Sequence, residues 1–237
     1  RRVLFRSATG VDFTSTVDDT GTGDAADATT EGNGDGDAGD SNSWTVTTTN
    51  AGGGGCPIDT FIAVESDDAE EPAGGGTVDL ASSDLELIAD GADQQVGLRF
   101  TSLDIDQGAT ITNAYLEFTA QEAPKDNAAN LTFYAHDTDS ALTFSNTAGE
   151  KVTDRPKTTA SVTWSNVPAW TTNGAQYQSP DISAVIQEIV DRPGWTNNND
   201  LAIIITGTTG SHRVADAHGT GTNVKLHVEC SGAATPA

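Results

Sequence analysis

The chain has 237 residues, of which 35 are acidic and 11 are basic, so its formal net charge is −24 at pH 7. A protein this negative is repelled by phosphate backbones and by anionic lipid, which argues against nucleic acid and membrane surfaces as partners and favours cations. Solubility in a salty or extracellular setting is the alternative reason for the charge. No apolar run approaches the roughly 18–20 residues that span a bilayer, so no membrane insertion is predicted.

The N-terminal quarter of the chain does not have the composition of a folded domain. Residues 1–7 (RRVLFRS) look like a translated sequencing adapter, so we exclude them from the fold. Residues 8–55 are rich in Gly, Thr, Asp, Ala and Asn, which predicts an acidic linker without fixed structure. Within it, residues 33–40 resemble the start of a calcium loop, but Ala38 and Trp44 stand where such a loop has glycine and glutamate.

One all-β domain is predicted over residues 56–230, followed by a tail at 231–237. Apolar and polar residues alternate through two stretches of segment 95–120, the pattern of two half-buried strands joined by a turn. Across this hairpin Arg99 is predicted to pair with Glu117. Spacers rich in Gly, Asn, Asp, Ser and Pro favour an antiparallel β-sandwich of jelly-roll type. The predicted strands are 58–65, 84–89, 95–101, 110–120, 131–136, 161–164, 201–206 and 224–229.

Two elements have distinctive patterns. The run LAIII at 201–205 does not alternate, so it predicts a central strand buried on both faces. A helix is predicted at about 180–191, with Ser179 as N-cap, Pro180 at the first helical position and Asp181 in the first turn. Its apolar stripe should close one edge or end of the sandwich. The stripe consists of Ile182, Val185, Ile186, Ile189 and Val190.

The two cysteines lie just before the first predicted strand and just after the last one. Because the terminal strands of a sandwich are often neighbours, a disulfide between Cys56 and Cys230 is geometrically sensible. Such a bond would imply an oxidising compartment and, in the chain-entropy model, stabilise the fold by about 5 kcal/mol. The alternative is two unrelated free thiols.

Five short segments follow one another in a familiar order. They are VGLRF (96–100), GATITNAYLEFTA (108–120), ASVTWSNVPAW (160–170), PDISAVIQEIV (180–190) and LAIIITG (201–207). This succession resembles the DNRLRE-type, disaggregatase-related, carbohydrate-binding-like β-sandwich modules of secreted bacterial and archaeal proteins. The resemblance covers about residues 59–229. It implies a non-catalytic jelly-roll module joined to neighbouring domains of a larger extracellular enzyme or adhesin, and some such modules bind polysaccharide. The hexapeptide that names the family is absent, so no sugar-contacting residue of the family maps onto this chain.

Acidic residues cluster on both sides of a glycine-rich loop, at 66–71 (SDDAEE) and 82–86 (SSDLE). If the flanking strands pair, several carboxylates meet, and Ca²⁺ would neutralise their repulsion because it prefers oxygen ligands. A structural calcium is also what the resemblance implies. The alternative is a solvated acidic loop. The predicted ligands are Asp67, Asp68, Glu71 and Asp84, with Glu70 as a further candidate.

Aromatic side chains matter for sugar binding, because a flat ring can stack on the apolar face of a pyranose. Trp170 and Trp195 lie in predicted loops and are, with Tyr177, the predicted carbohydrate-binding residues. Tyr115 and Tyr134 are further candidates. The alternative for each ring is a place in the core, since tryptophan buries a large area.

No nucleophile elbow, Walker loop, dinucleotide fingerprint or HExxH motif occurs, so the prediction is not an enzyme. Three functions remain: a secreted or cell-surface polysaccharide-binding module with calcium, a structural or adhesive spacer without a glycan site, and a hydrolase. An exposed coplanar pair of Trp and Tyr rings would favour the first. Burial of every tryptophan would favour the second, and two carboxylates across a deep cleft the third.

Overall fold

The computed structural model describes residues 2–6, 12–16, 55–208 and 210–231. The chain divides into two compact units, Arg1–Ala51 and Gly52–Ala237. In the first unit, β1 (Arg2–Arg6) pairs antiparallel with β2 (Asp12–Thr16), where an adapter remnant and a linker were expected. The candidate calcium loop at 33–40 lies outside the described residues.

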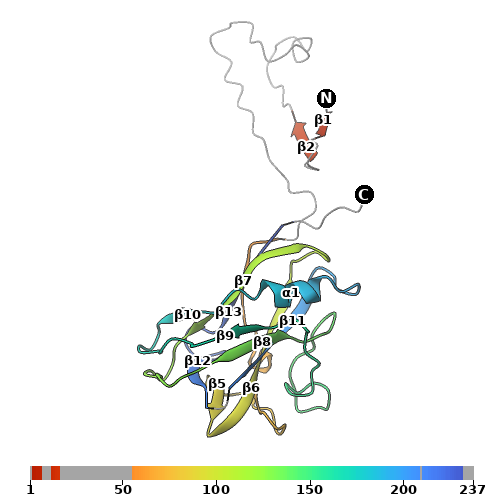
Figure 1. The fold of residues 1–237 in the computed structure, drawn as a ribbon. Helices are drawn as coiled ribbons and strands as arrows, with labels where there is room; N and C mark the ends of the chain where they lie inside the picture. Colours follow the sequence, from red (N-terminus) through yellow and green to blue (C-terminus); the bar gives the residue numbers. More distant parts are fainter. Residues whose placement is uncertain (1, 7–11, 17–54, 209, 232–237) are drawn as a thin grey trace, which may run out of the picture. The chain divides into compact units, whose positions relative to one another are not determined.

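The second unit is a sandwich of two antiparallel sheets with one short helix, as predicted (Figure 1). The four-stranded sheet has the order β10 (Gln176–Gln178), β7 (Thr110–Thr119), β13 (Lys225–Ser231), β3 (Ile58–Phe61). The five-stranded sheet has the order β9 (Val162–Trp164), β8 (Leu131–Ala135), β11 (Asn199–Gly207), β6 (Ala92–Leu103), β4 (Asp68–Pro72). A ribbon of β5 (Asp84–Asp90) and β12 (His212–Asp216) joins the five-stranded sheet at the β5–β6 hairpin.

The alternating residues of β6 and β7 point their apolar side chains into one core between the sheets. Val96, Leu98 and Phe100 are fully buried there, as are Leu116 and Phe118. The two strands do not form a hairpin, however, because β6 pairs with β11 and β4 while β7 pairs with β13 and β10. The predicted pairing of Arg99 with Glu117 is therefore wrong.

The five-stranded sheet is buried on both faces, which confirms the prediction for the run at 201–205. Leu201, Ile203 and Ile205 of β11 face the main core, whereas Ala202 and Ile204 join a second apolar cluster on the outer face. That cluster is completed by side chains from the long connections that precede β5 and follow β8. Its members from these connections are Val78, Ala141, Phe144 and Val152.

The helix α1 (Ser183–Val190) begins later than predicted. Ser179 is not its N-cap: its Oγ accepts the N–H of Leu116 in β7 at 3.0 Å. Asp181 lies before the first turn, and its Oδ1 accepts the N–H of Ser183 at 2.8 Å. The physical reason is that Ser179 and Ile182 donate their N–H groups to carbonyl oxygens of β7. These bonds hold the segment along β7 and outside the helix.

The predicted apolar stripe of α1 is buried and closes one edge of the sandwich. Gln187 Oε1 accepts the N–H of Ile111 in the four-stranded sheet at 2.7 Å. Glu188 Oε2 accepts the N–H of Ala160, just before β9 of the five-stranded sheet, also at 2.7 Å. The helix therefore bonds to both sheets at this edge. Among the described residues, none of the helices combines the length and apolarity that a membrane crossing requires.

A disulfide joins the two ends of the sandwich. Cys56 and Cys230 are bonded, with Cα atoms 5.5 Å apart and a separation of 174 positions in the sequence. The first and last strands of the sandwich, β3 and β13, are antiparallel neighbours, which brings the two cysteines together.

Candidate functional site

The tryptophans that were predicted to contact sugar lie in the core. Trp170 is 0% exposed and Trp195 is 1% exposed. Trp195 donates its Nε1–H to the carbonyl oxygen of Ile105 at 2.9 Å. Trp170 stacks on the half-buried Tyr177, with ring centroids 4.9 Å apart and 13° between the planes. Both indoles are used for packing, because their burial removes a large apolar area from water, and neither offers a face to a sugar.

The acidic segment after the first strand is a buried edge strand rather than a loop. In β4, Asp68 to Glu71 are buried. Asp68 Oδ2 accepts the N–H of His218 at 2.7 Å, and Glu71 Oε2 accepts the N–H of Thr153 at 2.7 Å. Burial raises the pKa of Asp68 to about 6, because the charged form loses its hydration. Backbone donors stand in for water around these carboxylates and compensate part of that loss.

The predicted calcium ligands have separate protein partners. Asp67 pairs with Arg99, and Asp68 and Glu71 accept backbone N–H groups. Asp84, at the start of β5, lies beside the hydroxyl of Ser83, and burial raises its pKa. Within the described ranges, no group of three or more His, Cys, Asp or Glu side chains is arranged to hold a metal ion.

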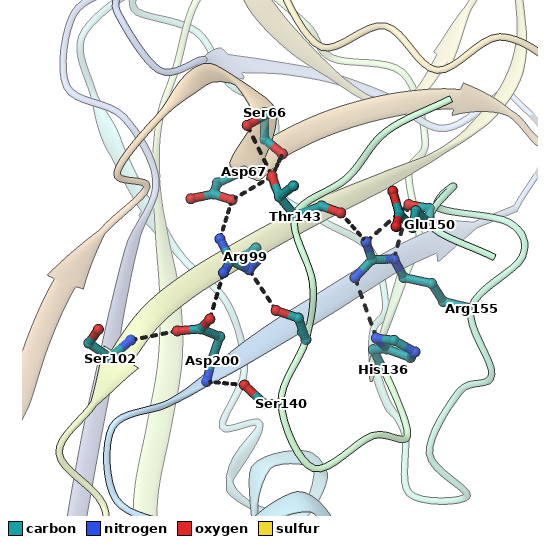
Figure 2. A network of polar contacts seen from close by, with 11 residues as sticks. Ser66, Asp67, Arg99, Ser102, His136, Ser140, Thr143, Glu150, Arg155 and Asp200 are labelled. Atoms are coloured by element: carbon teal, nitrogen blue, oxygen red, sulfur yellow. Dashed lines mark hydrogen bonds and ion pairs between the residues drawn. The ribbon is translucent and has the colours of Figure 1, made fainter. Parts of the chain in front are cut away.

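Arg99 is the centre of a polar network on the outer face of the five-stranded sheet (Figure 2). Its Nη1 lies 2.6 Å from Asp67 Oδ1, its Nη2 lies 2.5 Å from Asp200 Oδ2, and its Nε donates to the carbonyl of Ala141 at 2.7 Å. Asp200 also accepts the N–H of Ser102 at 2.8 Å. The network ties β6 to β11, to the segment before β4 and to the loop after β8.

Arg155, which is buried, binds the same loop through a separate set of contacts (Figure 2). Arg155 places its guanidinium 4.0 Å above the centre of the Phe144 ring. It donates to the carbonyl oxygens of Thr143 and Glu150 at 2.9 and 3.0 Å. Burial and the neighbouring Arg155 charge lower the pKa of His136 to about 4, so this imidazole is neutral at pH 7. These contacts hold the loop in place.

Glu70 is a buried acid with an acidic neighbour. It is 6% exposed, and its Oε1 accepts the N–H of Glu86 at 2.6 Å and the Nε2–H of Gln94 at 2.7 Å. No Lys, Arg or His of the described residues forms an ion pair with it. Burial, followed by the Glu86 carboxylate, raises the pKa of Glu70 to about 9. Glu70 is therefore protonated at neutral pH and donates a hydrogen bond to Glu86.

The outer face of the four-stranded sheet, which we call the open face, carries polar and aromatic side chains that range from half-buried to exposed. Tyr115 of β7 lies directly opposite His227 of β13, and their rings stack 4.7 Å apart at 26°. On the next strand, Phe61 of β3 is opposite Lys225 and is 45% exposed. The open face is defined by two cross-strand rows, Gln178–Glu117–Lys225–Phe61 and Tyr115–His227–Asp59.

Charged side chains fix the rings of the open face. Lys225 Nζ lies 3.0 Å from Glu117 Oε1, and His227 Nδ1 lies 2.9 Å from Asp59 Oδ1. The Glu117 carboxylate raises the pKa of Lys225 by accepting its hydrogen bond. Asp59 retains more than half of its side-chain exposure, at 58%. The face thus combines positioned rings with carboxylate oxygens that still have lone pairs for a ligand.

A comparison of the chain with protein-family models and with curated proteins finds no match.

Sequence reasoning missed the open face as a unit. Tyr115 was a candidate, but Phe61 and His227 were not associated with it. The alternation of polar and apolar residues in 110–120 and 224–229 does place Tyr115 and His227 on an outward face. Only the pairing of β7 with β13 and of β13 with β3 puts the three rings next to one another.

Proposed function

We propose that this chain is a non-catalytic extracellular module that binds polysaccharide and belongs to a larger secreted or surface protein. The observation that supports this most directly is the open face, where three rings lie among hydrogen-bonding side chains on the rigid surface of a sheet. Such a surface suits a ligand that is apolar on one side and rich in hydroxyl groups at its rim.

Two further features support the proposal. The order of segments from VGLRF to LAIIITG resembles the DNRLRE-type modules, which are parts of extracellular proteins. The disulfide between Cys56 and Cys230 hints at an oxidising compartment, because cytosolic thiols are usually kept reduced.

The non-catalytic character is supported by the state of the acidic residues. Most glycoside hydrolases need two carboxylates that face the substrate across a cleft. The carboxylates that the fold gathers in β4 are instead buried against backbone N–H groups or another acid.

A structural or adhesive spacer without a glycan site is the second candidate. It is favoured by the burial of Trp164, Trp170 and Trp195, the tryptophans of the described residues. On this alternative the rings of the open face contribute only to the packing of neighbouring side chains.

The two candidates are separated by thermal unfolding of the full 237-residue chain in the presence of soluble polysaccharides. A ligand that binds only the folded state stabilises it by about 2.7 kcal/mol at a concentration of 100 Kd, which raises the melting temperature. A rise with at least one polysaccharide supports the binding module. No rise with any member of a broad panel, together with no binding in isothermal titration, supports the spacer. The same scans with Ca²⁺ and with a chelator test whether calcium stabilises the fold.

A further inference from the structure

We infer that the open face is the ligand surface, and that its ligand is an uncharged polysaccharide chain lying across β7, β13 and β3. This inference rests on the proposed polysaccharide-binding function and adds to it the location of the site and the chemical class of the ligand.

Phe61 carries the first part of the argument. Phe61 is 45% exposed in the edge strand β3, and it differs from a scattered surface residue because it lies on the same sheet face as Tyr115 and His227. It lies diagonally across from His227, since β3 pairs Phe61 with Lys225 and Asp59 with His227. Diagonal neighbours in a sheet are roughly 7–8 Å apart, so the three rings lie in one strip across β7, β13 and β3.

The strip is fixed before a ligand arrives. Tyr115 and His227 stack on each other, and Asp59 holds the imidazole at 2.9 Å. In the other row, Lys225 is held by Glu117 at 3.0 Å. Side chains that are already ordered lose little conformational entropy when a ligand binds, and this increases affinity. Strands lie about 4.8 Å apart, so the strip extends across about 10 Å, which suits an extended chain better than a single small molecule.

The polar groups around the strip match hydroxyl groups. Asp59 and Glu117 present carboxylate oxygens, which accept hydrogen bonds from hydroxyl donors. Gln178, exposed on β10, provides both an amide donor and an acceptor at the other end of its row. A sugar chain offers donors and acceptors at short intervals along its rim, while the apolar faces of its rings cover the aromatic strip.

Charge decides the class of polysaccharide. Asp59, Glu117 and Glu229 place three carboxylates on or beside the strip, against the single ammonium group of Lys225. The whole chain carries a net charge of −24. An anionic polysaccharide would be repelled both locally and at long range, whereas an uncharged one is not.

The test uses ring removal on the open face with matched controls elsewhere. Tyr115→Ala and Phe61→Ala are compared with Tyr134→Ala, a half-buried tyrosine of β8 in the other sheet, and with Leu142→Ala, which removes an exposed apolar side chain from the loop after β8. The probes are barley β-glucan, xyloglucan and glucomannan as uncharged chains and alginate as an anionic chain. Binding of each full-length variant is measured by isothermal titration.

We expect each open-face variant to weaken binding of the best uncharged probe roughly tenfold, the effect of about 1.4 kcal/mol. We expect Tyr134→Ala and Leu142→Ala to bind within about twofold of the unaltered chain, and alginate not to bind. If Tyr115→Ala lowers stability, Phe61→Ala still tests the site. Phe61 is 45% exposed, so removal of its ring should disturb the core little.

Each contrary result has a separate meaning. Binding that survives both open-face substitutions but is lost in a control variant overturns the location and leaves the proposed function standing. Alginate binding as tight as that of the uncharged probes overturns the ligand class. No binding of any probe by the unaltered chain overturns the function and the inference together. A change of oligomeric state in the open-face variants, without a change in affinity, would identify the surface as a contact between copies and also overturn the inference.

Discussion

The two outer faces of the sandwich differ in a way that their residue types do not suggest. The five-stranded sheet contains Arg99 and β4, the most acidic strand of the sandwich. Its outer face is nevertheless covered by a loop and by a second apolar cluster. The open face of the four-stranded sheet carries aromatic rings and remains accessible.

The difference shows that the use of a sheet face depends on whether a loop packs over it, and not on the residue types that it carries. On the covered face Gly97 leaves room for the Phe144 ring, since a Cβ at this position would meet that ring. Phe144 in turn carries the Arg155 guanidinium, which anchors the loop. Charges on this face are used for structure. On the open face, no loop of the described residues contributes to an apolar cluster over the rings, and Asp59 keeps 58% of its side-chain exposure for a ligand.

The largest loss of stability is expected when the disulfide is removed. The second apolar cluster covers the five-stranded sheet and includes no residue of the four-stranded sheet, whose edge strand β3 pairs with β13 alone among the described strands. Replacing both cysteines by alanine should lower the free energy of unfolding by at most about 5 kcal/mol, the chain-entropy value for a loop of 174 residues. Urea unfolding of the variant and of the oxidised chain measures the difference. A loss below about 1 kcal/mol would mean that the sheet is held together by its core alone.

The next effect concerns the covered face. Arg99→Ala leaves Asp67, which is 0% exposed, as an uncompensated charge. Breaking a buried pair in this way costs about 3–5 kcal/mol, because the remaining ion is buried and keeps only the hydroxyl of Thr143 as a hydrogen-bond donor. In urea unfolding, the double variant Arg99→Leu/Asp67→Leu should be more stable than Arg99→Ala. If Arg99→Ala unfolds like the unaltered chain, the network of Figure 2 contributes nothing to stability.

A smaller change in stability is expected when the pH rises from about 7 to about 9, and its direction follows from the raised pKa of Glu70. The unfolded chain releases the Glu70 proton near the usual pKa of 4.5, whereas the folded protein keeps it up to about 9. Between these values the folded state binds more protons, so its stability falls as pH rises and the decline ends above about pH 9. Glu70→Gln should flatten this decline.

The useful window lies between about pH 7 and about pH 9, since the shifted groups Asp68 and His136 have pKa values near 6 and 4. Thermal unfolding across this window compares the unaltered chain with Glu70→Gln, and Glu117→Gln on the open face is the control. An unchanged slope in Glu70→Gln would show that Glu70 is already ionised in the folded protein.

The smallest effect should come from the open face. Lys225→Ala removes the ion pair with Glu117, and both side chains retain about a fifth of their exposure. Exposed pairs of this kind contribute about 0.2–1 kcal/mol, because water screens them. Chemical denaturation of Lys225→Ala beside Arg99→Ala therefore compares the two faces directly. Equal losses would abolish the distinction between a covered and an open face.

Local patterns in the sequence were enough to predict the sandwich class, most of its strands and the central position of β11. They succeeded where each strand has its own apolar periodicity, as in 95–101 and 110–120. They failed for β4, whose residues Asp68, Glu70 and Glu71 look solvated, because its burial depends on partners far away in the chain. Glu71 is bonded to Thr153, 82 residues away, and Asp68 to His218, 150 residues away.

The site could be predicted only in part, for the same reason. Trp170 and Trp195 lie in loops by sequence, but loops can pack under a sheet, and nothing local distinguishes a buried loop ring from an exposed one. Arg99 was correctly placed on the polar face of its strand. Its partners could not be identified, because β6 and β7 belong to different sheets and Asp200 is about half the domain away in sequence.

The covalent link between Cys56 and Cys230 also determines how this domain would respond to mechanical pulling. Tension that reaches the chain outside residues 56 and 230 passes from one cysteine to the other through the disulfide, and the loop between them bears no load. In a surface protein under shear, the sandwich would therefore transmit force at nearly constant length. Its core would not be stretched, and the open face would keep its shape while the chain on either side of the two cysteines is under tension.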